Sequence, residues 1–110
     1  MISRQWRGLA KLDRSEDYID HLHKDTLPKL QLLAGFVDAS ILQRRLADGV
    51  EFIVVTRWQS LTAIEAFAGG NLDMAVVPDN VKEMMIEYDS SVRHYTIVQS
   101  PCPECHTPPR

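Results

Sequence analysis

The segment EFIVVTRW, residues 51–58, restricts the fold of this chain more than any other feature of its sequence. Its length and its β-branched and aromatic residues predict a β-strand. Successive side chains of a strand point to opposite faces of the sheet, so each face can be considered separately. One face consists of Phe52, Val54, Thr56 and Trp58, and the other has Ile53 and Val55 between Glu51 and Arg57. Both faces are rich in apolar groups, and we therefore expect both to be covered.

A tight turn joins this strand to the one before it. Asp48 and Gly49 form a strong turn signal, and residues 36–46 in front of it have the pattern of a strand. The two strands are therefore expected to form a hairpin. A first strand is expected at residues 2–10 and a last one at residues 92–98.

The first helix is expected to begin at Ser15, a suitable N-cap residue that is followed by acidic side chains. It should run to about Gly35, with a kink or break at Pro28. On the helical wheel, His23 flanks the apolar arc and could reach a pocket, whereas His21 points to solvent.

Two short helices complete the pattern. One is expected at residues 61–67 after the N-cap Ser60, and the other from Asp79 to about residue 88. The resulting order of strands and helices matches the split βαβ arrangement of ferredoxin-like domains. We therefore predict an α+β domain at residues 1–99, with a four-stranded antiparallel sheet and its helices on one face.

The sheet face without helices would expose many apolar groups in a single copy of the chain. The expected patch consists of Val37, Ala39, Ile41, Ile53 and Val55. Soluble monomers rarely expose apolar patches of this size, so we expect two copies to pack sheet against sheet in a symmetric homodimer. The partner would cover the second face of the strand at residues 51–58.

Charge and hydropathy exclude several classes of partner. The net charge is -3, and the 12 lysine and arginine residues are scattered, so nucleic-acid binding is not expected. No apolar run is long enough to cross a membrane, and the N-terminus lacks the apolar core of a secretory signal. We therefore expect no membrane partner and a cytoplasmic location. Two cysteines near the C-terminus cannot form a disulfide framework for the core.

Six short motifs lie between residues 18 and 98, and the resemblance that they carry covers about residues 2–98, nearly the whole expected domain. They are YxxHL at 18–22, LPKL at 27–30, GFVDA at 35–39, EFIVVTRWQS at 51–60, AIEAFAG at 63–69 and VRHYTIV at 92–98. In their order and spacing they resemble the antibiotic-biosynthesis-monooxygenase-like family. The resemblance implies a dimeric α+β barrel, which agrees with the fold expected from the strand pattern.

The resemblance also implies a range of functions. Relatives include cofactor-free oxygenases that convert polycyclic anthrones into quinones, and proteins that bind and degrade haem. In both groups the pocket lies between the sheet and the helices, and a tryptophan at the position of Trp58 helps to line it. The haem-degrading relatives have an asparagine at about the position of Trp6 and an axial histidine near that of Val77. In this chain tryptophan and valine occupy these two positions.

A cofactor-independent monooxygenase is the leading interpretation, with a small, flat, hydrophobic substrate such as a polyketide-like or quinone-like molecule. The alternative is a non-enzymatic module that binds a small molecule or haem, or a haem-degrading enzyme of the same fold. Cofactor-free oxygenation needs a group that removes a proton and a group that stabilises the resulting oxyanion, in a pocket that excludes water. We expect no metal and no cofactor.

Candidate residues for these roles lie on the expected strands and helices. His94 could be the general base, since histidine exchanges protons near neutral pH, or a core histidine bonded to backbone. Arg4 could neutralise an enolate or a carboxylate. Core packing is the alternative role for Trp58, and the dimer interface is the alternative for Trp6. The candidates for substrate binding are Trp6, Trp58, Phe67 and His23.

The C-terminal segment, residues 100–110, is rich in proline and cysteine and is expected to be a flexible tail. Its CPECH motif contains Cys102, Cys105 and His106 and fits the pattern of covalent c-type haem attachment. The same three groups are weak candidates for metal ligands, because a structural zinc ion usually takes four. An inert tail is the third interpretation.

Overall fold

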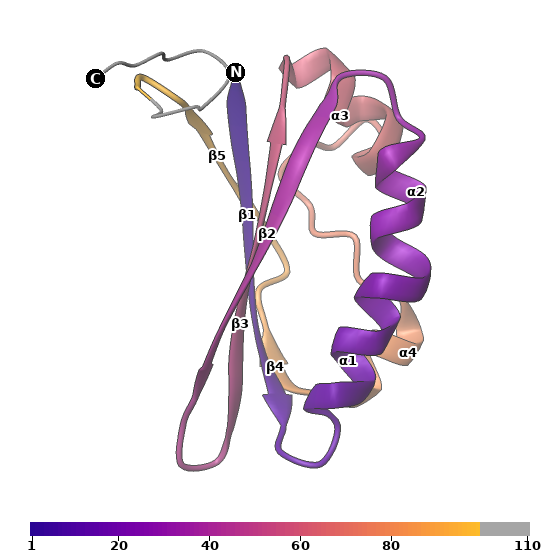
Figure 1. Cartoon of the computed structure of the whole chain (residues 1–110). Helices are drawn as coiled ribbons and strands as arrows, with labels where there is room; N and C mark the ends of the chain where they lie inside the picture. Colours follow the sequence, from indigo (N-terminus) through magenta and orange to yellow (C-terminus); the bar gives the residue numbers. More distant parts are fainter. Residues whose placement is uncertain (100–110) are drawn as a thin grey trace, which may run out of the picture.

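An antiparallel sheet with helices on one of its faces forms the structure (Figure 1). The structure is a computed structural model, and it describes residues 1–99 of the 110-residue chain. The predicted α+β, ferredoxin-like architecture is confirmed, with the difference that the last strand is split in two. None of the helices in the described range is long and apolar enough to cross a membrane.

The sheet has its longest strands at its centre and at one edge. Its strands are β1 (Ile2–Lys11), β2 (Phe36–Arg45), β3 (Gly49–Trp58), β4 (Met85–Tyr88) and β5 (Arg93–Thr96). The order is β2-β3-β1, and β4 and β5 both pair with the other side of β1. The predicted hairpin is confirmed, because β2 and β3 are antiparallel neighbours. In the turn between them, the Leu46 N–H donates to the Gly49 carbonyl over 2.8 Å.

The last strand is divided into two pieces that pair with different parts of β1. Strand β4 lies against residues 8–10, and β5, which falls inside the predicted last strand, lies against residues 2–5. Between the two pieces, the Asp89 N–H still donates to the Arg7 carbonyl of β1 over 2.9 Å, and residues 90–92 leave the ladder. Helix α4 (Asp79–Met84) ends directly before β4, so the prediction of a longer helix here was wrong. Pairing with the free side of β1 satisfies the backbone of this segment and outweighs its helical pattern.

A helical segment with a widened turn covers much of the sheet. It consists of α1 (Ser15–His21), the π-helical turn η1 (Leu22–Thr26) and α2 (Leu27–Gln31). The irregularity predicted at Pro28 therefore lies in η1, the turn that precedes this proline. In a regular α-helix the proline ring would clash with the carbonyl four residues earlier, and the widened turn avoids this clash. Ser15 was expected to be the N-cap, but Arg14 occupies that position. The Ser15 hydroxyl instead donates to the Leu12 carbonyl over 3.4 Å.

The loop after α2 packs against α3 (Leu61–Ala68). Helix α3 begins as predicted, since the Ser60 hydroxyl accepts a hydrogen bond from the Ala63 N–H over 3.2 Å. Gly35 in the loop has a φ of 88°, a conformation that favours glycine. A Cβ at this position would also lie only 2.4 Å from the Cβ of Ala63. This tight connection fixes the distance between α3 and the start of β2.

The core lies between the sheet and the helices, in two clusters of buried side chains. The predicted inner face of β3 is confirmed, since Phe52 and Trp58 are fully buried beneath the helices. Phe52 packs edge to face on Tyr18 of α1, with ring centroids 4.9 Å apart. Trp58 forms the second cluster with Leu30 of α2 and Ile64 of α3.

A bulge in β2 changes which of its side chains face the helices. Between Phe36 and Asp38 the pairing with β3 shifts by one, so Val37 is the extra residue. As a consequence Ala39 and Ile41 lie on the helix side of the sheet. The prediction that they belong to the helix-free face was wrong, because a one-residue shift moves every following side chain to the other face.

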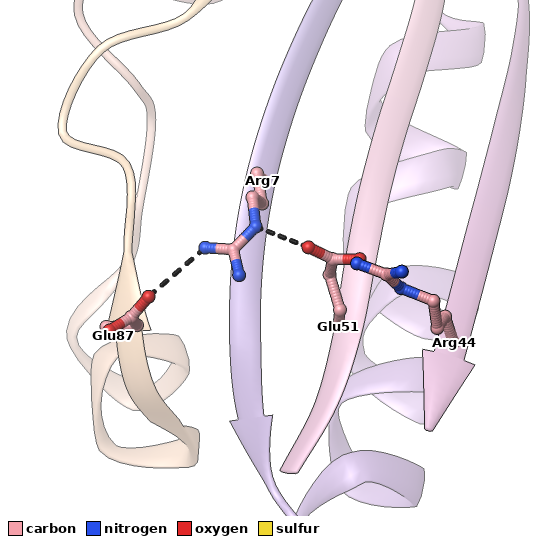
Figure 2. A network of polar contacts seen from close by, with 4 residues as sticks. All are labelled: Arg7, Arg44, Glu51 and Glu87. Atoms are coloured by element: carbon pink, nitrogen blue, oxygen red, sulfur yellow. Dashed lines mark hydrogen bonds and ion pairs between the residues drawn. The ribbon is translucent and has the colours of Figure 1, made fainter. Parts of the chain in front are cut away.

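The helix-free face carries a row of ion pairs across four strands (Figure 2). Glu51 of β3 accepts hydrogen bonds from Arg7 of β1 over 2.6 Å and from Arg44 of β2 over 2.8 Å. Arg7 also reaches Glu87 of β4 over 3.2 Å. The bond from Arg7, followed by the bond from Arg44, lowers the pKa of Glu51. This face is therefore more polar than the sequence alone suggested.

Candidate functional site

A cavity of about 70 Å³ lies between the sheet and the helices. Its walls come from β1 and β3, from the helical segments α1 to α4, and from the loop before α4. Since a water molecule occupies about 30 Å³ in the liquid, the cavity has room for roughly two waters, so it admits one edge of a small flat molecule. Most of the lining is apolar or aromatic. The polar side chains in the lining are Arg4, His21, Thr26 and Thr56.

Arg4 brings a buried positive charge to this cavity. The residue is only 4% exposed and lies on the face of β1 that meets the helices. Its Nη1 donates to the Leu72 carbonyl over 2.7 Å and its Nη2 to the Met74 carbonyl over 3.0 Å. Its guanidinium carbon lies 5.6 Å from the ring centroid of Phe67, a favourable cation–π distance. The loop before α4 and helix α3 thus hold the guanidinium at the cavity wall.

Part of the Arg4 guanidinium is available to a ligand. Of its five N–H groups, three donate to Leu72, Met74 and His94. Within residues 1–99, neither the Nε–H nor the second N–H of Nη2 has a hydrogen-bond partner. Burial lowers the pKa of Arg4, and the charge of Asp73 acts in the opposite direction. The group stays charged at neutral pH, so it can bind an anionic oxygen.

His94 lies on β5 directly opposite Arg4. Its Nε2 is 2.9 Å from Arg4 Nη1, and because a guanidinium can only donate, Nε2 must be the acceptor and the proton is on Nδ1. Nδ1 is 3.6 Å from the carboxylate of Asp73. His94 lies outside the lining of the cavity. In this arrangement its ring contacts Arg4.

The stability of the wild-type protein is expected to fall more than that of the His94→Gln variant between about pH 7.5 and pH 5.5. Burial, followed by the nearby charge of Arg4, lowers the pKa of His94 below its ordinary value of 6.5. As the pH falls, the unfolded chain therefore binds a proton at His94 before the folded protein does. The neutral His94 imidazole therefore contributes stability that is fully present above about pH 6.5. This contribution is lost as the pH falls through the lowered pKa of His94 in the folded protein. Urea unfolding of both proteins at the two pH values measures the difference, and equal losses would contradict it.

Trp6 lines the cavity from β1, and therefore does not lie on the helix-free face. Its Nε1 donates to the Asp89 carbonyl over 2.8 Å, and its ring centroid is 6.2 Å from that of Tyr18. Gly8 leaves room for the indole, since a Cβ there would lie 2.5 Å from the ring. The position of this aromatic wall is thus set by the backbone on two sides.

Trp58 lies one layer behind the cavity. Its side chain is fully buried, and its Nε1 donates to the Thr56 hydroxyl over 2.8 Å. Its ring centroid is 5.3 Å from that of Phe36 and 6.1 Å from that of Phe67. Phe67 is part of the cavity lining, whereas Trp58 is not. Trp58 therefore supports the wall that Phe67 forms.

The two histidines of the first helical segment face different spaces. His23 borders a second hollow, next to β2, and does not line the cavity. His21 does line it, although the sequence placed this residue toward solvent. The buried arc of the helix is centred on Tyr18 and Leu22, while Ile19 is only partly buried. His21 lies on one flank of this arc and His23 on the other, so counting Tyr18 as apolar would have identified His21.

The described residues do not form a metal site, and they lack one feature of the haem-degrading relatives. Within residues 1–99 there is no group of three or more histidine, cysteine, aspartate or glutamate side chains that could hold a metal. Val77 in the cavity lining offers no nitrogen ligand at the position where the family resemblance implies an axial histidine. The weak metal candidates Cys102, Cys105 and His106 lie outside the described residues, as does the predicted tail.

No family model and no curated protein matches the chain by sequence. Its fold is nevertheless similar to solved structures. One is a Bacillus cereus protein provisionally described as an antibiotic biosynthesis monooxygenase, with a TM-score of 0.64 and 19% identity over 91% of this chain and 94% of that one. Another is the haem degrader MhuD from Mycobacterium tuberculosis, with two haems in its active site, at a TM-score of 0.57 and 14% identity over 91% of this chain and 98% of that one. The predicted resemblance is thereby confirmed as a structural one.

Proposed function

We propose that this chain, which has the fold of antibiotic biosynthesis monooxygenases, is a cofactor-independent monooxygenase. Its substrate would be a small, flat, hydrophobic molecule with an acidic C–H next to a carbonyl, as in polyketide-like or quinone-like compounds. The observation that carries the proposal is the buried guanidinium of Arg4 in an otherwise largely apolar cavity. A buried charge in such surroundings is costly unless it is paired, which favours a ligand with an anionic oxygen.

The reaction needs no electron donor other than the substrate. After it loses a proton, the substrate is an enolate that passes electrons to dioxygen. Overall, a methylene carbon loses both hydrogens and gains one oxygen atom as a carbonyl, and the second oxygen atom leaves as water. Arg4 would stabilise the enolate oxygen, while Trp6 and Phe67 would hold the ring system. His94, through Arg4, and Trp58, through Phe67, would keep these groups in place.

Oxygen uptake with anthrone, a flat ketone of this class, tests the proposal. We expect the protein to consume one dioxygen per anthrone and to form anthraquinone well above the rate in buffer, with no effect of a metal chelator. Saturable binding of anthrone without quinone would contradict the enzyme and support the second candidate, a non-enzymatic binding module, which the buried Arg4 also favours. Neither uptake nor binding would contradict both.

We also propose that the chain forms a symmetric homodimer through the helix-free face of the sheet. Proteins of this fold commonly form dimers. On this face Leu42 is 53% exposed and Val55 is half-buried, between the ion pairs of Glu51 and the pair that Arg57 forms with Asp38. Light scattering after size exclusion should give the mass of two chains. Val55→Asp should reduce it to one chain, because it would bury an unpaired charge. A wild-type mass of one chain would contradict the proposal.

A further inference from the structure

We infer that His21 is the proton acceptor in this cavity, an inference that rests on the proposed oxidation of a carbon acid there. His21 belongs to α1 on the helix side of the cavity, and Arg4 belongs to β1 on the sheet side. A substrate between these walls has a base on one side and a cation for its developing oxyanion on the other. The C–H bond breaks, its electron pair remains in the enolate, and the proton forms an N–H bond on the imidazole.

The imidazole of His21 is oriented by groups on either side of its ring. Its side chain is 10% exposed, and its Nε2 lies 3.7 Å from the carboxylate of Asp25, about one helical turn further along. On the other side, Nδ1 lies 3.4 Å from the side-chain nitrogen of Asn80 on α4. A carboxylate next to Nε2 favours the tautomer that has its proton there, so the lone pair is on Nδ1. Asn80 is exposed and its contact is long, so it occupies the Nδ1 lone pair only weakly.

The polar groups nearest to His21 come from its own helical segment and from α4. Asp25 is placed to stabilise the imidazolium that forms, as a carboxylate does beside a catalytic histidine. Lys29 of α2 approaches Asp25 to 3.0 Å, but its side chain is 72% exposed, so solvent and salt screen its charge. Asn80 is neutral, and Arg4 is the charged side chain in the opposite wall.

His94, the base expected from the sequence, is less well placed for this step. Its Nε2 lone pair accepts a hydrogen bond from Arg4, and its Nδ1 faces Asp73. It also lies outside the cavity lining. A substrate proton could reach it only after Arg4 had moved, which would remove the cation that the enolate needs. His21 combines access to the cavity with a lone pair that only a long contact occupies.

Formation of the anthrone enolate under nitrogen tests the role of His21 separately from oxidation. We expect the wild type to convert bound anthrone into the enolate, detected by its visible absorption, and His21→Gln to bind anthrone but form the enolate about 100-fold more slowly or worse. Added imidazole should restore part of the rate to His21→Ala. Asp25→Asn should slow the step less than His21→Gln. Asp20→Asn, which removes an exposed carboxylate from the same helix, should behave as wild type.

The outcomes separate this inference from the proposed oxygenase. Equal rates of enolate formation in His21→Gln and wild type would overturn the assignment of His21 and leave the oxygenase standing. An enolate that depends on His21 but yields no quinone in air would support the assignment and overturn the oxygenase. If the wild type does not bind anthrone, both are overturned.

Discussion

Replacing Trp58 by alanine is expected to lower the free energy of unfolding by about 3–5 kcal/mol. The side chain is fully buried between Phe36 and Phe67, so its removal leaves a space that the neighbouring elements cannot fill. The Thr56 hydroxyl would also lose its donor. Since a small domain has a total stability of about 5–15 kcal/mol, this loss would be a large fraction of the total. Urea unfolding followed by circular dichroism measures the change, and an unaltered midpoint would show that Trp58 is not a core residue.

Trp58→Phe is the matched variant, because it keeps an aromatic ring and removes the N–H that Thr56 accepts. We expect it to cost about 1–2 kcal/mol and to leave the affinity for a cavity ligand unchanged, since Phe67 separates Trp58 from the cavity. A loss of affinity without a loss of stability would mean that Trp58 contacts the ligand directly, as the family resemblance implies.

Replacing Arg4 by methionine is expected to weaken the binding of a flat anion by about 10–100-fold, because a hydrogen bond to a charged group contributes about 1.5–3 kcal/mol. The coloured anion of 2-hydroxy-1,4-naphthoquinone is a suitable probe for an absorbance titration. Stability should also fall, by about 2–4 kcal/mol, since the carbonyls of Leu72 and Met74 and the ring of His94 lose their donor.

Two comparisons separate the loss of an anion site from a collapse of the cavity. The neutral compound 1,4-naphthoquinone should lose little affinity for Arg4→Met, and Arg45→Met, which changes an exposed arginine at the end of β2, should bind both quinones as wild type does. Arg4→Lys should be intermediate, because lysine keeps the charge but not the planar set of donors. Equal losses for the two quinones would contradict the anion site.

The sequence was sufficient to predict the central strands, because alternation along β1 and β3 depends only on neighbouring residues. It therefore also predicted that Arg4 and Trp6 share a face. The alternation failed in β2, where Val37 is an extra residue. No local pattern marks this residue, since the bulge arises only when β2 pairs with β3. A contact between distant segments thus decided which face Ala39 occupies.

Two further differences also depend on contacts between distant segments. Residues 85–88 have a helical pattern by themselves, and they form a strand because β1 offers an unpaired edge. The surroundings of His94 follow from the loop before α4, whose carbonyls hold Arg4 and whose Asp73 approaches His94. Only the folded chain brings this loop to β1, so the sequence could not show that His94 contacts Arg4 and lies outside the cavity lining.

The interruption between β4 and β5 has a consequence for how such a protein diversifies. Residues 90–92 leave β1 and pair with the loop before α4, where the Val92 N–H donates to the Asp73 carbonyl over 2.8 Å and the Ala75 N–H to the Ser90 carbonyl over 3.0 Å. The same loop supplies the carbonyls that hold Arg4. An insertion or deletion in this gap would resize the cavity while both neighbouring ladders keep their register. Specificity can therefore evolve here without a change in the sheet on which folding depends.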